Sequence, residues 1–248
     1  MAFLTRWDED RSKPAFSSAL RDVFLRAVLP AVLLFGVVVG FGFLLKGPLA
    51  SFGKWENGVS KSFEDGRTET WNTITKFMSM IGNTEYVIAV GVILCAIVWW
   101  RTKEWWFAVV PLIAISLQAT VFVIAAAVVS RERPPVERLD PTPPTSSYPS
   151  GHVGASTALY VSFALMATRI QNVVVRRLVI VVCILAPLLV SYARLYRGAH
   201  HISDIVMGML NGVLCALLAW NYLRREPAGS AGTGAAASGE DESVQTRA

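Results

Sequence analysis

Long uncharged apolar segments alternate with short polar links along the chain. Six apolar segments stand out, at residues 27–45, 86–100, 105–129, 153–167, 178–193 and 202–223. A bilayer crossing takes about 20 mostly apolar residues, and a segment in lipid must satisfy its own backbone hydrogen bonds. The pattern therefore predicts an all-α, polytopic membrane protein whose six transmembrane helices form a bundle.

The polar regions divide the chain further. Residues 1–26 predict a cytoplasmic N-terminal arm that is too long for the leading part of a signal peptide, so the first apolar segment is expected to be retained. Between residues 46 and 85, Trp55, Phe63 and Trp71 recur among polar residues. This spacing predicts an outer amphipathic loop, either a helix lying on the membrane or a lid. Residues 224–248 are rich in Gly, Ala and Ser and predict a disordered cytoplasmic tail, which leaves residues 27–223 as the membrane domain.

Composition and charge agree with a membrane protein. The chain is 53% hydrophobic and 17% charged, which is more apolar than a soluble domain of this size. Its net charge of +5 comes from Lys and Arg that cluster in the links between apolar segments, so membrane topology explains the charge better than nucleic-acid binding. The three cysteines, Cys95, Cys183 and Cys215, all lie inside apolar segments and show no disulfide or metal-binding spacing.

Topology places the histidines on one side of the membrane. The basic links at one side of the bundle predict that both termini are cytoplasmic. The opposite, outer links contain all three histidines: His152 in SSYPSGHVGAS, and His200 and His201 in YARLYRGAHHISDIVMG. The same links also carry arginines that the topology does not require, which suggests another role for Arg131, Arg133, Arg138, Arg194 and Arg197.

The link before the last segment contains a histidine–carboxylate pair. His200 and Asp204 are four residues apart, so they share a face if the last helix begins near His200. A carboxylate on one imidazole nitrogen fixes the tautomer and leaves the other nitrogen as a base or nucleophile. Asp204 is also the only charged side chain within the six apolar segments, and such groups are functional by default.

The sequence Pro149-Ser150-Gly151-His152 predicts a place for an anion. Ser150 is a favourable N-cap for the fourth helix, whose first amides and dipole attract negative charge. Gly151 lets the backbone approach a ligand closely, and a phosphate fits this description. His152 could then protonate a leaving oxygen, while Arg133 and Arg194 could bind phosphate oxygens through guanidinium forks.

Taken together, these residues resemble the type 2 phosphatidic acid phosphatase family, the lipid phosphate phosphatases that share a core with vanadium haloperoxidases. The family's first motif is matched at Arg133 and Pro134, its second at residues 149–152, and its third at Arg194, His200 and Asp204. The resemblance covers roughly residues 27–223. The chain departs from the family at Ala126, where the first motif has Lys, and at Ala193, where the third has Ser. We expect Arg131 to supply the charge of the missing lysine.

The resemblance implies a mechanism without a metal or other cofactor. His200 would attack phosphorus to form a phosphohistidine, Asp204 would orient His200, and His152 would protonate the leaving lipid oxygen. Arg133, Arg194, Ser150 and Gly151 would hold the phosphoryl oxygens. His201 is expected to lie outside the chemistry. The implied substrate is a polyprenyl diphosphate or a glycerolipid phosphate at the outer face of the cell membrane, with membrane lipids as the other partners and no nucleic acid.

Three alternatives stay open from the sequence. A zinc hydrolase could use the histidines and Asp204, although neighbouring histidines point to different helix faces and the arginines would repel a cation. Ala126 favours a non-catalytic or altered-activity protein that binds or transports a lipid phosphate on the same fold. A haloperoxidase is the third alternative, but embedding in a membrane favours a lipid substrate.

Overall fold

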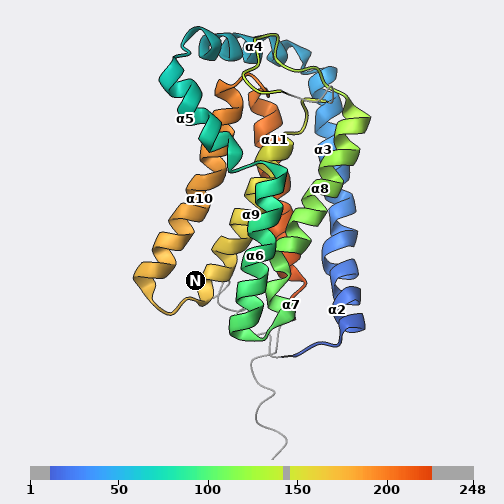
Figure 1. Cartoon of the computed structure of the whole chain (residues 1–248). Helices are drawn as coiled ribbons and strands as arrows, with labels where there is room; N and C mark the ends of the chain where they lie inside the picture. The colour runs from blue at the N-terminus through green and yellow to red at the C-terminus, as the bar shows by residue number, and fades with distance from the viewer. Residues whose placement is uncertain (1–11, 142–145, 225–248) are drawn as a thin grey trace, which may run out of the picture.

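The computed structural model describes residues 12–141 and 146–224, and in these residues all regular secondary structure is helical (Figure 1). The expected tail and the first part of the expected N-terminal arm lie outside the described residues. The helices in chain order are α2 (Phe16–Val23), the π-helical turn η1 (Phe24–Val28), α3 (Leu29–Lys46), α4 (Ala50–Asp65), α5 (Glu69–Met80), α6 (Thr84–Thr102), α7 (Trp105–Ala108), α8 (Val110–Val129), α9 (Gly151–Met166), the 3₁₀ turn η2 (Ala167–Arg169), α10 (Val173–Tyr196) and α11 (Ile202–Asn221).

Five helical stretches within the described residues are long and apolar enough to cross a bilayer. They are Phe16–Lys46, Thr84–Thr102, Trp105–Val129, Val173–Tyr196 and Ile202–Asn221, and their outward-facing side chains include many large apolar residues. The first stretch begins well before residue 27 because α2 and η1 continue directly into α3. The predicted all-α membrane bundle is therefore confirmed.

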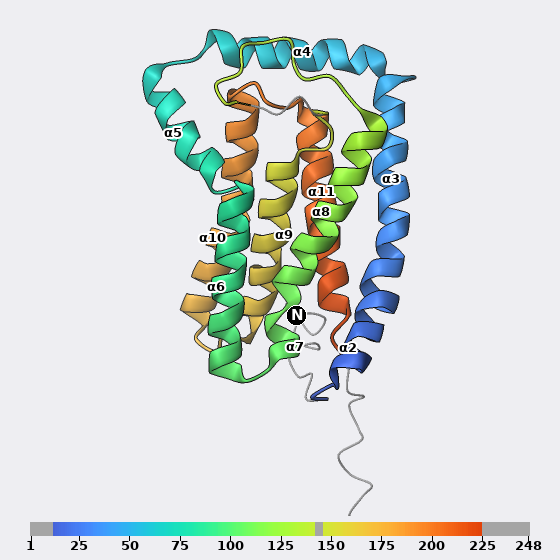
Figure 2. The same cartoon turned by 45° about the vertical axis from the view of Figure 1, so that its right-hand side comes forward.

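The fourth expected helix, α9, is shorter than the other five. It has 16 residues and lies at the centre of the bundle, in contact with α8, α10 and α11 (Figure 2). Other helices rather than lipid surround it, so the thickness of a bilayer does not fix its length. This central position brings the start of α9 close to the polar links of its neighbours.

Two glycines in α11 allow α9 to approach closely. A Cβ atom at Gly208 would lie 2.7 Å from the Ser150 carbonyl oxygen, and one at Gly212 would lie 2.6 Å from the Gly154 carbonyl oxygen. Any side chain at these positions would push the helices apart, and small residues serve this purpose in membrane bundles. As a result, the Ser150 backbone N–H donates a 2.9 Å hydrogen bond to the Asp204 carbonyl.

The expected outer loop at residues 46–85 forms two helices. Helix α4 crosses one end of the bundle, and α5 runs down along α10 (Figures 1 and 2). We refer to this end as the α4 end. Several aromatic side chains of the two helices are exposed, namely Phe52, Trp55, Trp71 and Phe77, as expected for helices at a membrane interface.

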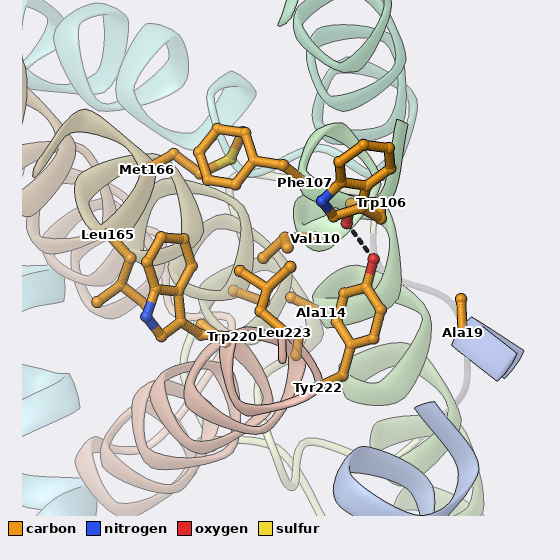
Figure 3. Packing of buried hydrophobic residues seen from close by; sticks show 13 residues of the cluster. Ala19, Trp106, Phe107, Val110, Ala114, Leu165, Met166, Trp220, Tyr222 and Leu223 are labelled. Atoms are coloured by element: carbon orange, nitrogen blue, oxygen red, sulfur yellow. Dashed lines mark hydrogen bonds between the residues drawn. The ribbon is translucent and has the colours of Figure 1, made fainter. Parts of the chain in front are cut away.

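An apolar cluster closes the opposite end of the bundle. Trp106 and Phe107 of α7 pack there against Trp220 and Tyr222 at the end of α11 (Figure 3). The Tyr222 hydroxyl donates a hydrogen bond to the Trp106 carbonyl. Because large aromatic side chains contribute strongly to core packing, this cluster anchors the helices far from the polar links.

Candidate active site

Three polar segments meet at the α4 end, namely the link after α8, the start of α9 and the link between α10 and α11. They border a cavity of about 660 Å³. Its wall includes five of the residues expected from the sequence: Arg133, Gly151, His152, Arg194 and His200. Away from these groups the cavity continues between α6 and α8, where its wall is apolar and includes Val87, Ile88, Ile115, Ala119, Phe122 and Val123.

His200 is fixed in one orientation and is buried. Its Nδ1 lies 2.7 Å from the Ser147 carbonyl oxygen, which can only accept, so Nδ1 carries the proton and Nε2 holds the lone pair. Burial and the positive charge of Arg194 hold the pKa of His200 well below 6.5, and the opposing charge of Asp204 does not compensate. His200 is therefore a neutral imidazole with a free nitrogen, as a nucleophile requires.

The expected contact between His200 and Asp204 is looser than a hydrogen bond. Their nearest atoms, Nδ1 of His200 and Oδ2 of Asp204, are 4.0 Å apart. At this distance in a buried site the carboxylate still acts on the imidazole by its charge. The tautomer, however, is set by the Ser147 carbonyl rather than by Asp204.

His152 faces the same cavity and is paired with Asn83. Its Nε2 lies 2.8 Å from the Asn83 side-chain oxygen, which accepts, so Nε2 is the protonated nitrogen. Asn83 also lines the cavity, just before α6. The sequence analysis did not identify Asn83, because it precedes His152 by 69 residues.

Two arginines supply positive charge to the wall. Arg133 donates to the Ala199 carbonyl at 2.8 Å, and Arg194 donates to Asp140 at 2.9 Å. The Nε groups of both arginines, and the side-chain amide nitrogen of Gln118, are buried without a hydrogen-bond partner among the described residues. Buried donors without partners are costly, so this wall is suited to an anion that would accept from them.

Asp140 orients Arg194 from the side. It also receives two hydrogen bonds from Arg197, at 2.8 and 2.6 Å, in a bidentate pair. Burial tends to raise the pKa of Asp140, but hydrogen bonding from Arg197 and the charge of Arg194 outweigh burial and lower it. Arg197, whose place in the sequence suggested a role beyond topology, is therefore a partner of Asp140.

Ser150 occupies the N-cap position of α9, as expected, but its side chain does not cap the helix. Its Oγ is buried and has no hydrogen-bond partner within residues 12–141 and 146–224. Ser150 itself is not part of the cavity wall, whereas Gly151 is. At the start of α9, therefore, Gly151 contributes to the cavity wall and the Ser150 hydroxyl is buried beside it.

Arg131 does not take the place expected for it. Its guanidinium donates to Asp204 at 2.6 Å and to Glu56 at 2.7 Å, and Arg131 is not part of the cavity wall. Two carboxylates therefore hold its guanidinium, and no part of it lines the cavity. These contacts do not support the expectation that Arg131 replaces the first-motif lysine.

His201 lies closer to Asp204 than expected. Its backbone N–H donates to Oδ2 of Asp204 at 2.8 Å, and its Nδ1 is 3.2 Å from the same oxygen. The two residues form a reciprocal capping box at the start of α11. A polar residue followed three positions later by an acidic one is a recognisable helix-start pattern, and it could have shown this contact in the sequence.

Lys76 is a basic residue of the wall that the sequence analysis missed. Lys76, Ser79 and Met80 line the cavity from one face of α5. Ala126 lies one turn beyond Phe122 and Val123 of α8, which line the cavity from the other side. Lys76 is therefore a basic residue of the wall contributed by α5, in a site where α8 has alanine in place of the first-motif lysine.

Residues 107–227 match the sequence model of the PAP2 superfamily. The fold is similar to that of a transmembrane PAP2 type phosphatidylglycerolphosphate phosphatase from Bacillus subtilis, with a TM-score of 0.66 and 19% identity over 77% of this chain and 92% of that chain. It is also similar to Aquifex aeolicus LpxE, with a TM-score of 0.53 and 17% identity over 65% of this chain and 92% of that one. No sequence among the curated proteins matches the chain. The matched segment contains the three motifs, and the resemblance predicted from the sequence is confirmed by this match.

Proposed function

We propose that the chain is a membrane-embedded phosphatase that hydrolyses a lipid phosphate through a phosphohistidine intermediate. The observation that carries this proposal is a single cavity with two histidines and two arginines at one end and an apolar wall between α6 and α8 at the other. The polar end suits a phosphate group, and the apolar part suits the hydrocarbon chain attached to it.

His200 is the proposed nucleophile. Its Nε2 lone pair would attack phosphorus while the bond from phosphorus to the lipid oxygen breaks. The Ser147 carbonyl holds Nδ1–H at 2.7 Å, and the nearby Asp204 carboxylate stabilises the positive charge that develops on the imidazole. Asp204 is thus proposed to act by its charge rather than by a direct hydrogen bond.

His152 is the proposed acid and base. His152 would act as an imidazolium and pass the Nε2 proton, directed at Asn83, to the leaving lipid oxygen, which leaves a neutral imidazole. In the second half of the reaction the same nitrogen would take a proton from the water that attacks the phosphohistidine. Inorganic phosphate then leaves, and His200 returns to its neutral form.

The phosphoryl oxygens would be held by fixed donors. Arg133, Arg194, the Gly151 amide and the Ser150 hydroxyl are proposed for this role, and Lys76 is added in place of Arg131. Donors positioned for charge that develops in the transition state are usually the largest source of catalysis. Arginines in this arrangement supply charge that a cation supplies in other phosphatases.

The substrate we propose is a polyprenyl diphosphate or a glycerolipid phosphate, presented at the outer face of the membrane. Basic residues at the end of the bundle opposite to α4 support an orientation with that end in the cytoplasm. They include Arg101, Lys103, Arg169, Arg176 and Arg177. Labelling of single cysteines placed in α4 and in the 101–104 link of intact cells would test this orientation.

Phosphate release over a panel of lipid phosphates tests the function. Detergent-purified protein would be assayed in EDTA with a polyprenyl diphosphate, phosphatidate and phosphatidylglycerol phosphate. We expect release from at least one lipid to persist in EDTA and to vanish in His200→Ala. Absence of release from every lipid would contradict the proposal. It would favour the binding or transport alternative, which the alanine at position 126 also favours.

A further inference from the structure

Glu56 is an unusual residue for a helix at the membrane interface. Helix α4 leaves Phe52 and Trp55 largely exposed, whereas Glu56 is only 1% exposed. Taking a carboxylate out of water is expensive unless it is paired and hydrogen-bonded. A stable buried Glu56 therefore requires partners that compensate for the loss of hydration of its carboxylate.

Each carboxylate oxygen of Glu56 has such a partner. Oε1 accepts a 2.7 Å hydrogen bond from the Ser203 backbone N–H, which is one of the first amides of α11 and has no partner within that helix. Oε2 accepts a 2.7 Å hydrogen bond from Arg131. Glu56 therefore caps α11 from a different helix and at the same time holds a guanidinium.

The same guanidinium reaches Asp204. Nη1 of Arg131 donates to Oδ1 of Asp204 at 2.6 Å and to Oγ of Ser203 at 2.7 Å. Burial would lower the pKa of Arg131, but the charges of Asp204 and Glu56 outweigh burial and raise it. One guanidinium is thus shared between two buried carboxylates, Glu56 and Asp204.

The neighbouring residue of α4 contacts the same region. Oδ1 of Asn57 lies 3.1 Å from Nε2 of His201, and Nδ1 of His201 lies 3.2 Å from Asp204. Two consecutive residues of α4 therefore reach Asp204 by two routes, one through Arg131 and one through His201. Neither Glu56 nor Arg131 is part of the cavity wall.

We propose that Glu56 is a positioning residue for the reaction and acts on Asp204 through Arg131. This role rests on the proposed phosphohistidine chemistry. If Arg131 paired with Asp204 alone, its charge would cancel the negative charge that stabilises the imidazolium at His200. By sharing Arg131, Glu56 leaves the cluster with a net negative charge and fixes the first turn of α11, where Asp204 lies.

Steady-state kinetics of Glu56→Gln test this role in the full-length protein in detergent, with the best substrate of the lipid panel. Glutamine keeps the size of the side chain but has only one acceptor oxygen and no charge. We expect kcat to fall about 10- to 100-fold, which is the range found when hydrogen-bond partners of metal-binding residues are removed. KM should change less than about 2-fold, because Glu56 does not touch the cavity. Asp65→Asn is the matched control, since Asp65 lies on the same helix, exposed and paired with Lys61.

Two further variants separate positioning from a merely structural role. Arg131→Met should also lower kcat at constant KM, and the double variant should lose less than the product of the two single losses because both act through one contact. If Glu56→Gln does not fold, Glu56→Asp carries the test and should lower kcat by a smaller factor. A protein that only loses stability would show fewer active molecules by active-site titration, with wild-type kcat for each of them.

The outcomes distinguish this role from the proposed function. An active wild type and a Glu56→Gln variant with unchanged kcat per active molecule would overturn the role of Glu56 alone. A loss that appears in KM rather than kcat would also overturn it. A wild-type protein that releases no phosphate from any lipid would overturn the proposed function and the role of Glu56 together.

Discussion

The cavity wall and the cluster behind Asp204 use similar residues but differ in how their buried polar atoms are satisfied. On the wall, the Nε groups of Arg133 and Arg194 have no hydrogen-bond partner among the described residues. In the cluster, Arg131 donates to both Glu56 and Asp204. A buried donor without a partner costs about 1–3 kcal/mol. The wall is therefore suited to an anionic ligand, whereas in the cluster the guanidinium and both carboxylates are paired and Asp204 is held in place.

Replacing His200 removes the proposed nucleophile. We expect His200→Ala to lower phosphate release at least about 1,000-fold, because the other groups of a catalytic set contribute little without the nucleophile. His201→Ala is the comparison. This variant loses a 3.2 Å side-chain contact with Asp204 but keeps the backbone N–H that binds the same carboxylate. Its phosphate release should therefore fall much less than that of His200→Ala. Equal losses in a phosphate-release assay would contradict the assignment of the nucleophile.

Replacing Arg194 tests the cavity wall alone. Arg194→Met removes one fixed donor and its charge, and we expect kcat to fall about 100- to 1,000-fold, as when an oxyanion donor is removed. Arg177→Met is the matched control, because Arg177 is exposed at the other end of the same helix, α10. A normal kcat in Arg194→Met, measured with the same lipid, would show that the wall does not bind the phosphoryl group.

Replacing Lys76 tests whether it serves in place of the first-motif lysine. Lys76 is exposed at the cavity, so we expect Lys76→Ala to lower kcat/KM only about 10-fold. Adding Ala126→Lys should restore much of this loss by bringing an ammonium group from α8.

Lys54→Ala, on an exposed part of α4, controls for a general change in surface charge. Unchanged kcat/KM in Lys76→Ala would contradict the role of Lys76. A Lys76→Ala defect that Ala126→Lys does not repair would show that the two positions do not serve the same site.

The protonation of His200 gives the smallest expected effect, a shift along the pH axis. Burial and Arg194 disfavour the imidazolium, so neutral His200 should persist as the pH falls below 6.5, and its reactivity should be lost only at a lower pH. The rate of carbethoxylation of His200 by diethylpyrocarbonate, followed by mass spectrometry without substrate, measures this midpoint. A midpoint at or above 6.5 would contradict the electrostatic account of the wall.

The bundle and the motif residues of the cavity wall were predictable from the sequence because both depend on local patterns. Apolar segments of membrane-spanning length located the helices, and the motifs around Arg133, His152 and His200 identified groups that line one cavity. The short α9, at Gly151–Met166, lies close to the segment predicted at residues 153–167. Its central place in the bundle could not be predicted, because it depends on packing against three other helices.

The contacts that were missed join distant parts of the chain. Arg131 and Glu56 are 75 residues apart, and Glu56 lies on a helix whose pattern indicated only a membrane surface. The sequence showed that Ala126 replaces a lysine, but not which residue brings charge to the cavity instead. Lys76 is placed there by the packing of α5 against α10, which no local pattern around Lys76 indicates.

Trapping the intermediate tests the central claim most directly. Protein mixed with a ³²P-labelled lipid phosphate would be quenched in alkali within milliseconds, digested and mapped. The account predicts label on the peptide that contains His200, stable in alkali and lost in acid, and no label in His200→Ala. Release of phosphate from the wild type with no label on His200 at any time would contradict the account, because it would mean that water attacks the lipid phosphate directly.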